Sequence, residues 1–101
     1  MNPTQEKSFL ISTATPNPEN PEEAKLYSTG AMELIKRSGG TVVGRHPIVK
    51  TILGDSTPGV VLVAEFPNDQ TILALFESDE YKALIPHREL GFKNVTLYVA
   101  H

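Results

Sequence analysis

The stretch from Val60 to Phe66 (VVLVAEF) constrains the fold of this chain most, because every residue in it except Glu65 is apolar. A short apolar run rich in valine is typical of a strand buried on both faces, whereas burial of one face gives strict alternation. Pro67 then ends the strand, and Asn68 can cap a helix by accepting hydrogen bonds from its first free N–H groups. We therefore predict a buried strand that leads directly into a helix.

Apolar residues at helical spacing predict two helices. The first starts after Asn20, an N-cap that is followed by Pro21 and by Glu23 as a capping-box partner. It ends at Gly39-Gly40. Its apolar stripe consists of Ala24, Tyr27, Ala31, Leu34 and Ile35. The second helical region is interrupted at Ser78-Asp79. Its apolar positions are Ile72, Leu75, Phe76, Tyr81, Ala83, Leu84 and Ile85.

Other stretches rich in β-branched and apolar residues are expected to form strands. Ser8 to Thr15 is the first of them. Thr41 to His46 and Ile48 to Leu53 form either two strands or one ribbon bent at Pro47, because proline is excluded from a central ladder position. Asn94 to Ala100 alternates and predicts the last strand, with one face formed by Val95, Leu97 and Val99.

This order of elements predicts a ferredoxin-like β-α-β-β-α-β plan, an α+β fold with two helices on one face of an antiparallel sheet. We expect a disordered segment over residues 1–7 and a single domain over residues 8–101. Two helices leave the other sheet face open, yet Val61 and Val63 lie on one face of their strand and Val60 and Leu62 on the other.

The open face predicts association, because burying one valine stabilises a protein by about 1.5–3 kcal/mol. We expect a homodimer in which two sheets pack face to face about a two-fold axis. The alternative is a monomer whose open face is covered by the ribbon 41–53 or by the N-terminus.

Composition excludes several functional classes. A net charge of −3 argues against nucleic-acid binding, which depends on lysine and arginine contacts to phosphate. The chain has no cysteine, and no apolar run approaches the roughly 20 residues that span a membrane. Its first residues also lack the pattern of a signal peptide. We expect a cytoplasmic protein that binds neither nucleic acid nor membrane.

Several motifs together resemble the domain of unknown function 1330 family, a member of the dimeric α+β barrel superfamily of ferredoxin-like domains. The resemblance covers roughly Gly39 to Ala100, and the segment before it matches only in plan. It is carried by Gly39-Gly40, Arg45, Gly54-Asp55, VVLVAEFPN (60–68), SDEYKALIP (78–86) and Arg88.

The resemblance implies the fold and the dimer but no particular reaction. The wider superfamily contains cofactor-free monooxygenases, lactone isomerases, haem-dependent enzymes and proteins without known catalysis. Their ligands commonly lie in a cleft between the sheet and the helices of one protomer. It therefore implies a small-molecule cleft here, and we expect no cofactor.

Four residues are the first candidates for such a site: Arg45, Glu65, Tyr81 and Arg88. A carboxylate on an apolar strand is costly unless it is paired, and the planar fork of arginine suits a carboxylate. An arginine could hold an anionic or carbonyl substrate while Glu65 or Tyr81 moves a proton. The alternative is that Glu65 and an arginine form an ion pair that only fixes the fold.

The remaining candidates are His46, a possible base because it follows Arg45, and Tyr27, a core residue or pocket wall. His46 and Arg45 would reach one pocket only if the strand bends at Pro47. We expect no metal site, since the three histidines lack ligand spacing and His87-x-Glu89 alone is weak.

Two functional hypotheses follow. The protein is either a cytoplasmic homodimer whose cleft performs proton-transfer, monooxygenase or isomerase chemistry on a small oxygenated metabolite, or a non-catalytic ligand-binding or assembly module. In the second case Glu65, Arg45 and Arg88 are structural.

Overall fold

The computed structural model describes residues 7–55 and 58–101, so most of the segment expected to be disordered lies outside the described residues. The elements in chain order are β1 (Ser8–Pro16), α1 (Pro21–Arg37), β2 (Thr41–Pro47), β3 (Val60–Phe66), α2 (Asp69–Glu77), α3 (Asp79–Lys82), α4 (Ile85–Gly91) and β4 (Phe92–Ala100).

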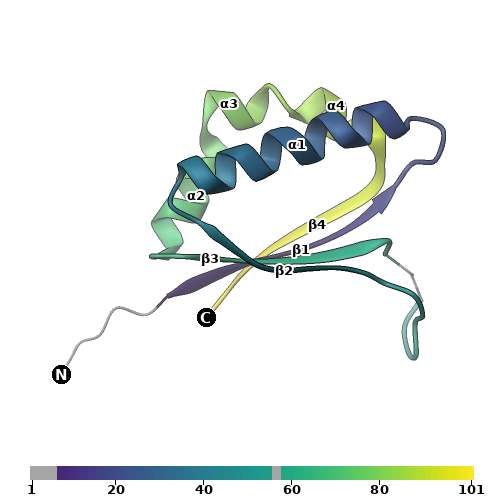
Figure 1. Ribbon diagram of the computed structural model, residues 1–101, viewed down its shortest axis with the longest axis horizontal. Coiled ribbons are helices and arrows are strands. Elements are labelled where there is room, and N and C mark those ends of the chain that lie inside the picture. The colour runs from purple at the N-terminus through teal and green to yellow at the C-terminus, as the bar shows by residue number, and fades with distance from the viewer. Residues whose placement is uncertain (1–6, 56–57) are drawn as a thin grey trace.

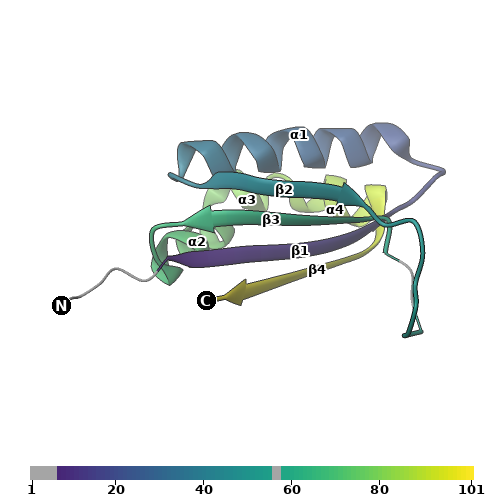
Figure 2. The ribbon, with the colours of Figure 1, turned by 60° about the horizontal axis from the view of Figure 1, so that its bottom comes forward.

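The strands form one antiparallel sheet in the order β2-β3-β1-β4. The helices all lie on one face of this sheet (Figures 1 and 2). The predicted ferredoxin-like α+β plan is therefore confirmed. None of the helices in the described part of the chain is both long and apolar enough to cross a membrane.

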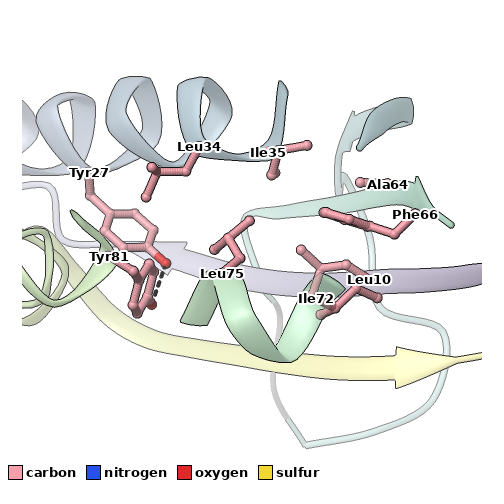
Figure 3. Close-up of a cluster of buried hydrophobic side chains, with 9 residues drawn as sticks. All are labelled: Leu10, Tyr27, Leu34, Ile35, Ala64, Phe66, Ile72, Leu75 and Tyr81. Carbon is pink, nitrogen blue, oxygen red and sulfur yellow. Dashed lines mark hydrogen bonds between the residues drawn. The ribbon is translucent and has the colours of Figure 1, made fainter. Parts of the chain in front are cut away.

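The core fills the space between the sheet and the helices, as Figure 3 shows. Leu10 of β1 pairs with Ala64 of β3, and both are almost fully buried against α1 and α2. Phe66 at the end of β3 has an exposed fraction of 1%. The alternate residues of β3, Val61 and Val63, are only partly buried, because they face away from the helices.

In the single chain, the sheet face opposite the helices is therefore not covered by them. Its central residues are apolar and partly buried: Phe9, Ile11, Val61 and Val63. None of the described segments crosses it in Figures 1 and 2. The predicted cover by the ribbon 41–53 is therefore wrong for its described residues, and the other predicted cover, the N-terminus, lies largely outside the described residues.

The first helix has the predicted bounds but not the predicted cap. The Asn20 side chain makes no capping bond and instead donates to the carbonyl of Leu90 at 2.9 Å. Glu23 forms no capping box and binds His87 Nδ1 of α4 at 2.6 Å. Both side chains thus join α1 to α4. Gly39 ends the helix with a φ of 90°, which glycine adopts without strain.

The second helical region consists of three short helices, not one. Asn68 caps α2 as predicted by accepting from Thr71 N–H at 2.9 Å. Ser78 is extended, with a ψ of 155°, and its hydroxyl accepts from Tyr81 N–H at 3.1 Å to start α3. The last strand begins at Phe92, directly after α4, earlier than predicted.

The expected strand Ile48 to Leu53 is absent, because this segment forms a loop. Only its first residue joins the sheet region, where Ile48 N–H donates to the Gly59 carbonyl at 2.9 Å. Strand β2 lies at the sheet edge, which is a position that tolerates Pro47. Its register shifts between Val42 and Gly44, which marks a bulge.

Candidate functional site

Three of the predicted site residues form one hydrogen-bonded cluster between the sheet and the helices. The hydroxyls of Tyr27 in α1 and Tyr81 in α3 lie 2.8 Å apart, and Figure 3 shows the two side chains converging. Arg88 Nη1 of α4 donates to the Tyr81 hydroxyl at 2.9 Å. The two tyrosines are buried, with exposed fractions of 8% and 3%.

Local structure brings these residues together. The cap at Ser78 starts α3 and directs Tyr81 inward. Gly91 lets α4 approach α1, because a Cβ there would overlap the backbone of Ala24. Aromatic packing then fixes the rings: Tyr27 meets Phe92 edge to face at 5.5 Å between centroids.

One of the two tyrosine hydroxyl groups in the cluster has an unused hydrogen-bond donor. As neutral phenols, Tyr27 and Tyr81 carry two O–H protons, and the bond between them uses one. Arg88 is a donor only, so it cannot accept the other proton. No described residue accepts that second proton. A buried hydroxyl donor usually has a partner, so this position suits an oxygen from a ligand or a water molecule.

Burial sets the protonation of the cluster. It raises the pKa of Tyr27 far above its ordinary value, and the hydrogen bond to Tyr81 adds to this rise. Burial alone would lower the pKa of Arg88, but the hydrogen bond to Tyr81 and the charge interactions with Tyr81, Tyr27 and Glu89 together outweigh it and raise the pKa of the guanidinium. Tyr27 is therefore a neutral hydroxyl and Arg88 a cation near neutral pH, so the cluster donates hydrogen bonds and does not act as a base.

Two hollows adjoin the tyrosine pair. A cavity of about 80 Å³ lies under α1, with Tyr27 in its wall and Arg45 among its lining residues. A cleft of about 370 Å³ lies between β4 and the helices α2 and α4, and it contains Tyr81 and Arg88. The second is within the size range of small-molecule sites. Its apolar walls include Leu10, Ile72, Phe76, Leu97 and Val99.

The other predicted site residues do not join this cluster. Glu65 lies on the open face and binds Lys7 Nζ at 2.5 Å, so the expected pair between Glu65 and an arginine is wrong in the single chain. His46 pairs with Val61 and also lies on the open face, exposed. Arg45 pairs with Leu62 and lies on the helix face. Arg45 and His46, which are adjacent in β2, thus lie on opposite faces of the sheet.

The bulge in β2 decides this division. Thr41 pairs with Glu65, and an unbroken ladder from that point would place Arg45 opposite Val61, on the same face as Glu65. The extra residue near Val43 shifts the register by one and moves Arg45 to the helix face. Nothing in the sequence of β2 marks the bulge, because its glycine also suits an ordinary edge strand.

Sequence reasoning missed the contact between Tyr27 and Tyr81, which lie 54 residues apart. It also considered His87 only as a metal ligand, whereas the ring binds Glu23. Within residues 7–55 and 58–101, no three His, Cys, Asp or Glu side chains converge as a metal site requires.

Solved structures share this fold at low sequence identity. A protein of unknown function from Rhodopseudomonas palustris matches with a TM-score of 0.79 and 17% identity, over 95% of this chain and 82% of that one. A dimeric ferredoxin-like protein of unknown function from Jannaschia matches with a TM-score of 0.71 and 7% identity, over 95% and 99% of the two chains. These likenesses concern the fold alone.

A third structure, from Nitrosomonas europaea, is provisionally named an antibiotic biosynthesis monooxygenase. It matches with a TM-score of 0.65 and 14% identity, over 98% of this chain and 92% of that one. No curated protein matches the sequence significantly.

The family comparison covers nearly the whole chain. Residues 7–100 match the family model described as "Domain of unknown function (DUF1330)". The match includes β1 and α1, which resembled the family only in plan when the sequence was considered alone. The chain therefore belongs to the DUF1330 family, and its fold is ferredoxin-like.

Proposed function

We propose that the protein binds a small organic acid or carbonyl compound in the cleft between β4 and the helices α2 and α4. The observation that supports this most directly is the spare hydroxyl donor of the Tyr27–Tyr81 pair beside the cationic Arg88. A carboxylate or carbonyl oxygen would accept from such donors. Arginine is suited to this task, because it presents several N–H groups in one plane.

The walls of the cleft indicate the rest of the ligand. They are mostly apolar, and Tyr81 and Arg88 supply the polar groups next to them. An apolar or aromatic body with one acidic or carbonyl group therefore fits the chemistry of the cleft. Binding sites for small molecules generally have this combination of apolar walls and a few placed polar groups.

The same donors suit one kind of chemistry. Hydrogen-bond donors aimed at a carbonyl oxygen stabilise the negative charge that develops there when the neighbouring carbon loses a proton. Of the proposed catalytic residues, only Tyr81 lines this cleft, while Glu65 and His46 belong to the open face. We therefore assign Tyr81, Arg88 and Tyr27 to ligand binding and charge stabilisation, and we assign no base.

The protein also associates, in this proposal, as a homodimer through the open sheet face. Phe9, Ile11, Val61 and Val63 form an apolar centre there without a covering layer in the described part of the chain. Each buried valine would contribute about 1.5–3 kcal/mol. The dimeric state stated for the Jannaschia structure supports this assembly.

A ligand screen tests the binding proposal. Aromatic and aliphatic carboxylic acids, and their uncharged methyl esters, are titrated by calorimetry and thermal shift into wild type, Arg88→Ala and Tyr81→Phe. The expected result is that at least one acid stabilises wild type and that Arg88→Ala loses most of this effect. Lys36→Ala is the control, because Lys36 is an exposed cation on α1 that lies outside both the cleft and the open sheet face. A bound acid whose affinity is the same in Arg88→Ala would refute the assigned site.

The competing role is structural, because the cluster also ties α1, α3 and α4 together. In that case Arg88→Ala and Tyr81→Phe lose stability, and no acid or ester binds to the wild-type protein. The same experiment therefore separates a binding site from a brace.

A further inference from the structure

The segment from Ile48 to Asp55, here named the apolar arm, carries the most exposed aliphatic side chains of the described chain. Val49, Ile52 and Leu53 have exposed fractions of 93%, 95% and 94%. The other large hydrophobic residues in the exposed class range from 42% to 60%, which is ordinary for a protein surface. Three almost uncovered aliphatic residues within five positions are not ordinary.

The base of the arm is fixed by backbone hydrogen bonds, although Val49, Ile52 and Leu53 are exposed. Ile48 N–H donates to the Gly59 carbonyl at 2.9 Å, and Gly59 N–H donates to the Ala14 carbonyl at 2.7 Å. A Cβ at Gly59 would also collide with Pro16, so the glycine allows close contact with β1. The arm is thus held at the end of the central strands.

The arm extends toward the side on which the sheet is open. In Figure 1 it descends from the end of β2, away from the layer of helices, and Figure 2 shows it beyond the end of the sheet. The exposed aliphatics of the arm therefore continue the apolar surface of Val61 and Val63 beyond the sheet.

We propose that the apolar arm packs on a second copy of this chain, against the open sheet face of the partner. This inference rests on the proposed homodimer. A second copy is favoured because the arm adjoins the face through which the two copies would meet. Two-fold symmetry places two arms in one interface, one from each chain, so six exposed aliphatic side chains are covered together. The arm then sets both the strength and the register of the dimer.

Sedimentation equilibrium tests the contribution of the arm. Ile52→Gln/Leu53→Gln is compared with Leu26→Gln/Leu90→Gln, a matched pair of exposed aliphatics on the helices, and with Val63→Lys on the open face. The arm variant should raise the dimer Kd by at least about 100-fold with an unchanged circular dichroism spectrum. The helix variant should behave as wild type, and Val63→Lys should dissociate the dimer.

The outcomes separate the two proposals. If Val63→Lys dissociates the dimer while the arm variant keeps the wild-type Kd, the dimer stands and the arm proposal is overturned. If wild type sediments as a monomer at millimolar concentration, the proposed dimer fails and the arm proposal fails with it. Arm-dependent binding to neutral phosphatidylcholine vesicles by a monomer would also overturn it, by assigning the arm to a membrane.

A second measurement locates the contact. The chain has no cysteine, so Ile52→Cys carries a spin label at one position only. When this chain is mixed with ¹⁵N-labelled wild type, any broadening of wild-type amide signals arises between chains. Broadening is expected at Val61, at Val63 and at Thr13, which lies opposite Val61 on the open face. If amide signals of other residues broaden while those of these three residues do not, the proposed position of the arm on the partner's open sheet face is refuted.

Discussion

The hydrogen bond between Tyr27 and Tyr81 gives a quantitative prediction. Removing the Tyr81 hydroxyl breaks the 2.8 Å bond to Tyr27 and the 2.9 Å bond to Arg88. A neutral hydrogen bond contributes about 0.5–1.5 kcal/mol, and an unpaired buried polar group costs about 1–3 kcal/mol. Arg88 is only partly buried, so water can replace its lost hydrogen bond to Tyr81. The loss of that bond therefore adds little to the cost of the substitution. We expect Tyr81→Phe to lower the free energy of unfolding by about 1–3 kcal/mol.

A double-mutant cycle isolates the bond itself. Tyr27→Phe and Tyr81→Phe each remove the same hydrogen bond, so their combined cost should be smaller than the sum of the single costs by about 0.5–1.5 kcal/mol. Urea unfolding is followed by far-ultraviolet circular dichroism, because the chain has no tryptophan. All variants are measured at one protein concentration, since the proposed dimerisation would link stability to concentration. Costs that add within about 0.3 kcal/mol would show that the two hydroxyls are not coupled.

Three further outcomes are expected. Since the pKa of Tyr27 is raised by burial, its contribution is complete below the ordinary tyrosine value and declines above about pH 10, so urea unfolding at pH 9–11 should show a steeper loss in wild type than in Tyr27→Phe. The bonds from Ser8 and His101 lower the pKa of Asp69, so its contribution is present near neutral pH and is lost as the pH falls below about 4; acid titration of Asp69→Asn should lack this component. Gly91→Ala should destabilise by about 1–3 kcal/mol, because its Cβ would overlap the α1 backbone, and an unchanged urea midpoint would contradict the close packing of α4 on α1.

The secondary structure could be predicted where local signals agree. The valine-rich strand, the proline and glycines around α1, and the cap at Asn68 all act within a few residues, so their effects are visible in the sequence. The break at Ser78 was visible as an interruption, but its consequence was not. Whether such a serine ends a helix depends on how the following turn packs, and here Tyr81 is buried as a result.

The site was predicted in part, and the reason lies in long-range geometry. Tyr27, Tyr81 and Arg88 were selected by residue type, but no pattern indicates that two tyrosines on different helices meet. The partner of Glu65 was wrong because arginine was chosen for its chemistry, whereas the face of Arg45 is set by a bulge. Lys7 reaches the carboxylate simply because it precedes β1 on the neighbouring strand.

The bulge in β2 has a consequence for how this family can diversify. In this sequence, the bulged pairing of the edge strand places Arg45, and not His46, on the face that lines the cavity under α1. Deleting Val43 would remove only the extra residue, so Arg45 would stay opposite Leu62 on the helix face and His46 opposite Val61 on the open face. Because the strand lies at the border of the sheet, no other strand pairing needs to change. The bulge can therefore absorb the loss of one residue while the same arginine keeps lining the cavity under α1.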